Sequence, residues 1–283
     1  MIYQPRNYSI NCKGNLINLQ HPLVMGILNV TPDSFFDGGK FTEENTILER
    51  VRQLVTDGAK IIDIGGASSR PGAALVTESE EEARLIPAIE LISTHFPELI
   101  ISVDTWRADL AEKAIRKGAH IINDISAGQF DVNMFETAAR LNVPYIMMHL
   151  KGEVTSMHQK FEYSNLIQDV IHYFQEKIVA LRKMGVKDIL IDPGFGFSKT
   201  TTDNFLLLNK LNSLQILDVP ILVGLSRKSM INNTLNISSK DALNGTSVLN
   251  SFALMGGATI LRVHDPKEAQ ECIQLFQAVT ATK

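Results

Sequence analysis

Cysteine is almost absent from this chain: two occur among 283 residues, Cys12 and Cys272, near opposite ends. Without a CxxC pair or further cysteines, the sequence has no disulfide framework and no cysteine-based metal site. The opening stretch "MIYQPRNYSINCKGN" also lacks the apolar core of a signal peptide, and no apolar stretch approaches the length that spans a bilayer. We therefore expect a soluble protein of the reducing cytoplasm, with no membrane partner.

Strong charge of either sign is also absent. The formal net charge is −4, and no run of five basic residues occurs. The bulk charge therefore gives no footprint for nucleic acid or for an anionic membrane, and an anionic substrate would need local positive groups. The composition, with 45% hydrophobic and 20% charged residues, is that of an ordinary soluble globular protein.

What the chain does have is a series of short apolar runs rich in valine and isoleucine. Most are continuous rather than alternating, which is typical of strands buried on both faces of a parallel sheet. The runs are 24–30, 60–66, 100–106, 120–126, 144–150, 188–194, 220–226 and 259–265.

Helical periodicity fills the stretches between these runs, as in residues 107–119 and 164–185. A further helix is expected over residues 44–59, with Ile47, Val51, Leu54 and Val55 on one buried face. Eight strands that alternate with helices, without a composition shift that marks a linker, predict one α/β domain over residues 1–283, a (β/α)₈ barrel. The main alternative is a doubly wound open sheet, which the count of eight disfavours.

The N-terminal residues 1–20 are predicted to form a short β-hairpin ahead of the barrel. The stretch "YSINCKGNLINL" contains two strand-like runs that would turn at Lys13-Gly14-Asn15.

Polar side chains stand at the end of nearly every predicted strand. In a barrel the carboxyl ends of the strands converge on one face, where active sites lie. These late positions are Asn29, Asp63, Asp104, Asn123, Asp124, His149, Asp192, Ser226, Arg227, Lys228, Arg262 and His264. One such residue is usually a cap or a core residue, as Asp63 and His149 could be. So many together predict a small ligand rich in hydrogen-bonding groups.

These polar residues divide into two chemical classes. Carboxylates and amides suit a flat heterocycle with amino and lactam edges, because a carboxylate accepts two N–H bonds and an amide both donates and accepts. They are Asp104, Asn123 and Asp192. Cations suit an anion instead, and arginine offers the bidentate fork that phosphate recognition favours. They are Arg70, Lys228, Arg262 and His264.

Three connections are candidates for active-site loops. In "IIDIGGASSRPGA" (61–73) a branched apolar run stops at two glycines and turns into serines, arginine and proline. Taken alone, this stretch slightly favours an ordinary surface turn over an anion-binding loop. Residues 31–45 and 151–164 are the longest polar or glycine-rich connections.

Metal binding by the protein alone is weakly supported, since there is no HxxEH motif and no EF-hand spacing. A magnesium ion carried by a polyphosphate could still use one protein oxygen, such as that of Asn29. The sequence also has no Walker A loop, no dinucleotide fingerprint and no GxSxG elbow.

Seven motifs follow one another along the chain: "MGILNVTPDSFFDGG" (25–39), "IIDIGGASSRPGA" (61–73), "ISVDT" (101–105), "GAHIINDIS" (118–126), "DPGFGF" (192–197), "LVGLSRKSMI" (222–231) and "RVHD" (262–265). They occur in this order in the dihydropteroate synthase family, which the chain resembles from about residue 20 to 275. Each motif is moderately specific, and all seven in order are very specific. The resemblance implies a TIM barrel, in agreement with the strand count, and a transferase of folate biosynthesis that sulfonamides target.

The reaction that the resemblance implies joins 6-hydroxymethyl-7,8-dihydropterin diphosphate to p-aminobenzoate and gives 7,8-dihydropteroate and pyrophosphate. Carried over by position, the catalytic residues would be Asp104, Asp192, Lys228, Arg262, His264 and Arg70. The substrate-binding residues would be Asn29, Asp63, Ser68, Ser69, Asn123, Met148, Phe35, Phe197, Pro71, Gly72 and Ser229. Asn29 would also bind Mg²⁺ together with the diphosphate. The family further implies a homodimer.

The implied mechanism follows the charges. Arg262, His264, Arg70 and the metal would stabilise the departing diphosphate. Asp104 and Asp192 would orient the pterin and stabilise the cationic methylene left behind. The aniline nitrogen, held in place, then attacks that carbon without a covalent enzyme intermediate.

Three positions depart from the common family pattern. Ala67 stands where members commonly carry glutamate, Ser69 where they carry threonine, and Phe36 where a serine is often seen. Ser69 keeps the hydroxyl, whereas Ala67 removes a carboxylate. We hypothesise that the adjacent aromatics Phe35 and Phe36 alter how p-aminobenzoate or sulfonamides fit, and comparable sulfonamide inhibition of a Phe36→Ser variant would contradict this.

Three other functions compete with this interpretation. A methyltetrahydrofolate methyltransferase would share the pterin contacts but has no use for the cations at Arg70, Lys228, Arg262 and His264. A Schiff-base aldolase would need Lys228 as a nucleophile with a depressed pKa, and an anion contact is the simpler role. A degenerate barrel that serves as a scaffold would not need so complete a set of motifs.

Overall fold

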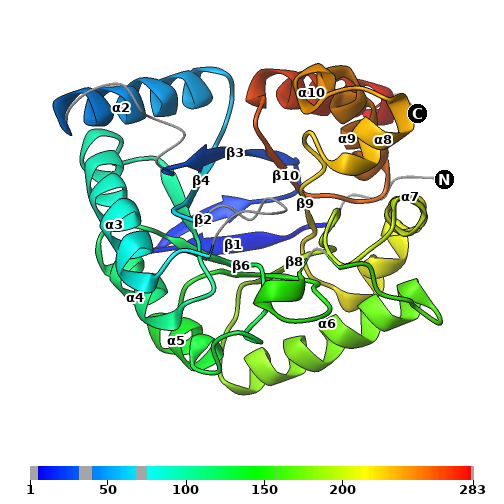
Figure 1. Cartoon of the computed structure of the whole chain (residues 1–283), viewed down its shortest axis with the longest axis horizontal. Helices are drawn as coiled ribbons and strands as arrows, with labels where there is room; N and C mark the ends of the chain where they lie inside the picture. Colours follow the sequence, from blue (N-terminus) through cyan, green and yellow to red (C-terminus); the bar gives the residue numbers. More distant parts are fainter. Residues whose placement is uncertain (1–5, 32–39, 68–74, 158, 282–283) are drawn as a thin grey trace.

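Strands and helices alternate along the chain in the computed structural model, which describes residues 6–31, 40–67, 75–157 and 159–281 (Figure 1). The strands in these residues are β1 (Ser9–Cys12), β2 (Asn15–Asn18), β3 (Leu23–Asn29), β4 (Ile61–Gly65), β5 (Ile100–Asp104), β6 (Ile121–Asp124), β7 (Tyr145–Met148), β8 (Ile189–Asp192), β9 (Leu222–Val223) and β10 (Ile260–Val263). The α-helices are α2 (Lys40–Thr56), α3 (Glu78–His95), α4 (Ala108–Arg116), α5 (Met134–Leu141), α6 (Leu166–Lys183), α7 (Thr201–Asn209), α8 (Ser229–Leu235), α9 (Leu243–Met255) and α10 (Pro266–Ala281). Short 3₁₀ turns are η1 (Val154–Ser156), η2 (Leu211–Leu217) and η3 (Ser239–Asp241).

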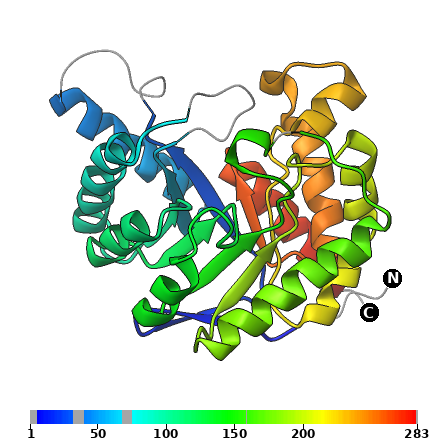
Figure 2. The same ribbon diagram turned by 60° about the horizontal axis from the view of Figure 1, so that its bottom comes forward.

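The strands β3 to β10 form a parallel barrel, as predicted. In the described part of the chain they make one eight-stranded sheet in the order β8-β7-β6-β5-β4-β3-β10-β9. A parallel bridge between Ile191 and Ile221 brings the two ends of this sheet together. The helices lie outside the strands (Figures 1 and 2), which gives the predicted (β/α)₈ TIM-barrel fold.

The observed strands are shorter than the predicted runs. The difference is greatest at 220–226, where only Leu222 and Val223 form the strand ladder of β9. Beyond β9 the chain turns at Arg227, whose φ of 57° is left-handed. Ser226, Arg227 and Lys228 therefore lie beyond the strand, in the connection at the carboxyl end of the barrel.

Each strand buries one set of side chains against the helices and the other inside the barrel, because successive side chains point to opposite faces. On β4, Ile62 and Ile64 belong to the large core between the sheet and the helices, whereas Ile61 belongs to a separate inner cluster. All five residues of β4 are buried. Burial on both faces explains the continuous apolar runs of the sequence.

The inner cluster fills the amino end of the barrel, and we call it the floor. It consists of Met25, Ile61, Ile121, Ile146, Leu190, Leu222 and Ile260, packed with Ile10, Cys12 and Leu19. The last three residues come from the predicted hairpin β1–β2 and the residue that follows it, and each is 1% exposed. Figure 2 shows this hairpin, in dark blue, beneath the barrel strands.

Polar contacts fix the hairpin to the barrel as well. The backbone N–H of Asn11 donates to Asp188 at 3.1 Å, and Lys13 donates to the carbonyl of Ile115 at 3.2 Å. The hairpin turns at Lys13 and Gly14, both with positive φ, as predicted. The floor is thus closed by a segment that precedes the barrel in the chain.

One predicted helix face is partly wrong. In α2, Val51 and Leu54 are fully buried and Ile47 is half-buried, but Val55 is 38% exposed. Val55 follows Leu54 by one residue, so it lies about 100° around the helix and reaches the edge of the buried face.

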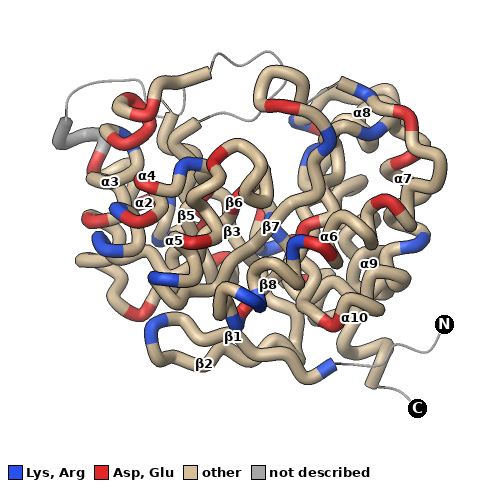
Figure 3. The backbone as a smooth tube through the Cα atoms, turned by 90° about the horizontal axis from the view of Figure 1, so that it is seen from below, with Lys and Arg blue, Asp and Glu red and all other residues tan. Residues whose placement is uncertain are grey.

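Acidic and basic residues are interspersed along the outer helices (Figure 3). None of the helices in the described residues is long and apolar enough to cross a membrane.

Candidate active site

A polar layer lies directly above the floor. Side chains two residues apart on a strand share a face, so the residues two positions beyond the floor also point into the barrel. They are Asp63 on β4, Asn123 on β6, Met148 on β7, Asp192 on β8 and Arg262 on β10. The strand register sets Asp104 of β5 beside Asn123. These predicted site residues therefore come together at one level of the barrel.

Arg262 joins three strands of this layer. Its Nε donates to Asp63 Oδ2 at 2.6 Å, and its Nη2 donates to Asp104 Oδ2 at 2.7 Å. Asn123 Nδ2 donates to the same Asp63 oxygen at 3.0 Å. The sequence predicted Arg262 among the cations for an anion, and the structure pairs it with two carboxylates, of which Asp104 was assigned to the heterocycle.

The network places the two carboxylates of Asp63 and Asp104 against the single guanidinium of Arg262, and the pKa values of Asp104 and Arg262 are shifted. Burial raises the pKa of Asp104 to about 7, with Arg262 opposing the shift and Asp63 adding to it. Burial works against the charge of Arg262, but Asp63 and Asp104 outweigh it and raise the pKa of the guanidinium. Asp63 is fully buried, and its Oδ1 has no hydrogen-bond partner among the described residues. A buried acceptor without a partner is costly, so the layer favours a ligand that brings donors.

Asp192 and Lys228 form the other half of the polar layer. Asp192 Oδ1 accepts a hydrogen bond from the Gly194 N–H at 2.8 Å. Burial raises the pKa of Asp192, while Gly194 and the nearby cations lower it. Burial lowers the pKa of Lys228 to about 8, against the attraction of Asp192. Lys228 is the N-cap of α8, and Ser229 follows it as the first helical residue.

Lys228 lies over an aromatic ring. Its Nζ is 4.4 Å from the centroid of Phe197, which is close enough for a cation–π interaction. Phe197 also belongs to a small apolar cluster with Ile125, Met148, Leu150 and Met157. Trp106 and Phe130 pack against this cluster.

Ile125 and Trp106 were missed by the sequence reasoning. Both stand one or two residues beyond a predicted polar residue, Ile125 after Asp124 and Trp106 after Asp104. The single tryptophan of the chain, placed directly after a strand end, was the available signal. The cluster gives the polar layer one apolar wall.

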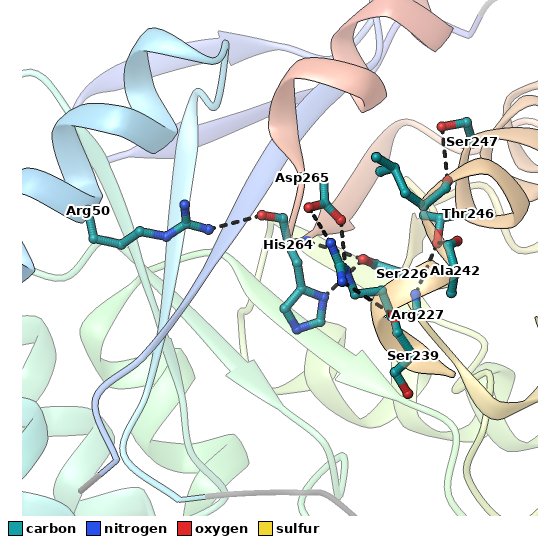
Figure 4. Close-up of polar contacts among 10 residues, drawn as sticks. Arg50, Ser226, Arg227, Ser239, Ala242, Thr246, Ser247, His264 and Asp265 are labelled. Carbon is teal, nitrogen blue, oxygen red and sulfur yellow. Dashed lines mark hydrogen bonds and ion pairs between the residues drawn. The ribbon is translucent and has the colours of Figure 1, made fainter. Parts of the chain in front are cut away.

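Ser226 and Arg50 hold His264 through three hydrogen bonds (Figure 4). Its Nδ1 and the Ser226 hydroxyl are 2.9 Å apart, and its backbone N–H donates to the same hydroxyl at 3.2 Å. Arg50, on α2, donates to the His264 carbonyl at 3.0 Å. Ser226 thus fixes the ring and the backbone of His264 together.

Arg227 points away from the polar layer, although it adjoins Lys228 in the sequence. It forms a bidentate ion pair with Asp265, at 3.0 Å from Nε and 2.7 Å from Nη2 (Figure 4). Its backbone N–H donates to Thr246 Oγ1 at 3.1 Å. Arg227 therefore locks the β9–α8 connection to the residue that follows His264.

Two other polar strand-end residues belong to the surrounding scaffold. Asp124 accepts from the Tyr145 hydroxyl at 2.6 Å and from the Ser126 and Gly128 N–H groups at 2.7 Å. His149 is 3% exposed, its ring contacts Tyr173 edge-on, and burial lowers its pKa well below the ordinary value. His149 is therefore a buried residue near the core, which is the alternative that the sequence left open for it.

Several predicted site residues lie outside the described residues: Phe35, Ser68, Ser69, Arg70, Pro71 and Gly72, together with Phe36. The described residues on either side of 68–74 are held by two arginines. Arg84 donates to the Gly66 carbonyl at 3.1 Å, and Arg107 donates to the Val76 carbonyl at 2.9 Å. Arg107 also pairs with Glu81, which is fully buried.

Asn29 is the predicted metal ligand, at the end of β3. A Cβ placed on Gly65 would lie 3.5 Å from Asn29 Oδ1 and 3.7 Å from Asp104 Oδ2, so both oxygens border the space beside Gly65. Within 6–31, 40–67, 75–157 and 159–281, no group of three histidine, cysteine or acidic residues could hold a metal ion. One amide oxygen fits a magnesium ion whose other ligands are phosphate and water oxygens.

Comparisons with known proteins agree with this geometry. A family model described as pterin binding enzyme matches residues 25–264. The chain is 40% identical over 273 residues to dihydropteroate synthase of Escherichia coli (strain K12), with 96% of each chain covered. It is 42% identical over 259 residues to the enzyme of Clostridium beijerinckii, covering 90% of this chain and 93% of that one.

Solved structures give the same result. Dihydropteroate synthase of Xanthomonas albilineans with 4-aminobenzoic acid has a TM-score of 0.91 at 37% identity, covering 98% of this chain and 100% of that one. The Yersinia pestis enzyme in a sulfonamide drug complex has a TM-score of 0.90 at 38% identity, covering 97% and 100%.

Proposed function

The chain belongs to the dihydropteroate synthases of the pterin-binding enzyme family, transferases that join 6-hydroxymethyl-7,8-dihydropterin diphosphate to p-aminobenzoate, and we propose how its own residues perform this condensation. The observation that carries the assignment is the polar layer, where one arginine pairs with two carboxylates and an amide donates to one of them, above a closed apolar floor. Neither a methyl transfer nor a Schiff-base aldolase needs this arrangement together with a diphosphate site.

The pterin binds on the polar layer. Asp104 and Asp192 accept hydrogen bonds from N–H groups on its amino and lactam edges, and the Asn123 amide both donates and accepts. Lys228 donates a hydrogen bond to the pterin from above. Asp63 supports the set from below by holding Arg262 and Asn123. Asp104 and Asp192 also carry the negative charge that stabilises the cationic methylene as the diphosphate departs.

The diphosphate lies toward His264 and Arg262, and Arg70 and Ser69 contribute from residues 68–72, which we call the second loop. When the pterin binds, its N–H groups donate to the carboxylates in place of Arg262. A nitrogen of the Arg262 guanidinium can then donate to the diphosphate. Magnesium, bound at Asn29, would supply positive charge to the leaving group. Ser226 keeps the His264 ring turned to one fixed orientation.

p-Aminobenzoate binds above the pterin, between the second loop and Lys228 with Ser229. Phe197, Met148 and Phe35 supply its apolar contacts. Its aniline nitrogen is held against the exocyclic methylene, so the attack is effectively intramolecular. No side chain forms a covalent intermediate, because pyrophosphate is already a good leaving group.

Release of pyrophosphate that depends on p-aminobenzoate tests this function. We expect purified protein to form dihydropteroate from both substrates, and the rate to fall on addition of a metal chelator. Lys228→Ala and Arg262→Ala should each reduce turnover by at least about 100-fold while the protein stays folded by circular dichroism. Undiminished turnover in either variant contradicts the proposed roles.

A homodimer fits one surface of the barrel. On α9, Val248, Phe252 and Met255 lie on one face and are 48%, 61% and 40% exposed. Leu206 of the adjacent α7 is 42% exposed. An apolar patch of this kind marks an interaction site. We expect Phe252→Glu to convert a dimer to a monomer in light scattering, and a monomeric wild type would contradict the proposal.

We also place the enzyme in the cytosol. Its two cysteines, Cys12 and Cys272, are buried as free thiols, which suits a reducing compartment.

A further inference from the structure

The loop between β8 and α7 is tied from within by a buried lysine. Lys199 is 5% exposed, and its Nζ donates to the carbonyl oxygens of Gly194 at 3.0 Å and Phe197 at 3.2 Å. Both carbonyls belong to "DPGFGF" and lie outside any strand or helix. They therefore depend on side-chain and turn contacts rather than on a ladder.

The backbone of this loop is irregular, which is why it needs such ties. Gly194, Gly196 and Ser198 have left-handed φ values of 71°, 81° and 50°. A Cβ on Gly194 would come within 2.2 Å of the His149 carbonyl oxygen. Asn204 provides a second tie, since its Oδ1 accepts from the Gly196 N–H at 2.8 Å.

The loop carries one wall of the site. Phe197 lies beneath Lys228, with 4.4 Å between Nζ and the ring centroid. A Cβ on Gly196 would come within 3.0 Å of Lys228 Cδ, so the loop backbone packs against the lysine stem as well. A shift of the loop would therefore move Phe197 and Lys228 relative to each other.

Burying a lysine costs free energy unless its ammonium group is hydrogen-bonded, so the two bonds to the loop carbonyls are the reason to keep it there. Burial lowers the pKa of Lys199 to about 7; Asp192 and Asp203 oppose this shift, and Lys228 adds to it. An apolar side chain such as methionine would fill similar volume without that penalty. What methionine could not do is donate to the two loop carbonyls.

We propose that Lys199 is a positioning residue, which holds the 194–197 loop so that Phe197 and Lys228 form the p-aminobenzoate side of the site. This rests on the proposed function, which assigns Phe197 to that substrate and places Lys228 between it and the pterin. The proposal predicts a selective effect: loss of the tie weakens p-aminobenzoate binding more than pterin binding or the chemical step.

The test compares Lys199→Met with the wild type in steady-state kinetics with both substrates varied. We expect the KM for p-aminobenzoate to rise at least tenfold, while kcat and the KM for the pterin diphosphate change less than threefold. Lys210→Met is the matched control, since Lys210 is exposed at the other end of α7, and all three parameters should stay at wild-type values.

Lys199→Arg keeps charge and donors, and it should keep the KM for p-aminobenzoate closer to the wild type than Lys199→Met does. If Lys199→Met does not fold, a Lys199→Arg enzyme with an undisturbed p-aminobenzoate KM supports the proposal, and equal changes in all three parameters overturn it. An unchanged p-aminobenzoate KM in folded Lys199→Met also overturns it. Wild-type protein that releases no pyrophosphate with p-aminobenzoate would instead overturn the proposed function, and this inference with it.

Discussion

Removal of Arg262 should expose the electrostatic cost of the polar layer. In Arg262→Met the fully buried Asp63 keeps a single hydrogen bond, from Asn123, and loses its cation. Breaking a buried ion pair by deleting one partner costs about 3–5 kcal/mol, because the remaining charge is uncompensated. We expect a loss of unfolding free energy in this range, measured by urea denaturation with circular dichroism and equal m-values.

The loss should also depend on pH, through Asp104. Burial holds its folded-state pKa at about 7, above the ordinary value of 3.8, so the folded protein keeps a proton that the unfolded chain has released. Stability is therefore lost as pH rises from about 4 to 7. Arg262 lowers this pKa, and without it the window extends above pH 7. The two proteins should diverge further above pH 7, by about 1.4 kcal/mol for each unit of additional pKa shift.

Two further variants complete this experiment. Arg262→Met combined with Asp63→Asn should recover at least half of the lost stability, because the buried charge is gone. Arg182→Met, at an exposed position of α6, should match the wild type. A loss below about 1 kcal/mol in Arg262→Met at pH 8.5, or a loss independent of pH, would refute the view that Arg262 compensates buried carboxylates.

Three other outcomes follow from the site. Asp192→Asn should raise the KM for the pterin diphosphate by about 10- to 100-fold, the worth of a hydrogen bond to a charged group, and a change below threefold speaks against a pterin contact. Since burial lowers the pKa of Lys228 to about 8, kcat/KM for p-aminobenzoate should fall above that pH, and Lys228→Arg should move the decline upward; identical profiles would exclude Lys228 as its source. Ser226→Ala, which removes the hydroxyl beside His264, should lower kcat about fivefold, and wild-type kcat would show that this contact does not position the ring.

The barrel and the level of the site could be predicted because both depend on local sequence patterns. Asn123 and Asp192 stand near the end of a buried apolar run and Asp63 interrupts one, and strand alternation alone turns them toward the interior. The hairpin was recognisable for the same reason, through its Lys13-Gly14 turn.

Contacts between distant segments could not be predicted in this way. Arg262 and Asp63 are 199 residues apart in the sequence, and their pairing depends on strand register around the closed barrel. Arg227 and Lys228 are neighbours with the same charge, yet the left-handed backbone at Arg227 sends one to Asp265 and leaves the other over Phe197. No local pattern distinguishes them.

The closed floor bears on the order in which the substrates bind. Because Ile10, Cys12 and Leu19 seal the amino end, substrates reach the polar layer from the carboxyl end of the barrel, where Phe197 and Lys228 lie. A p-aminobenzoate molecule bound there first would obstruct the route to the deeper pterin position. We therefore expect productive loading to be ordered, with the pterin first, and p-aminobenzoate in excess to act as a competitive dead-end ligand against the pterin.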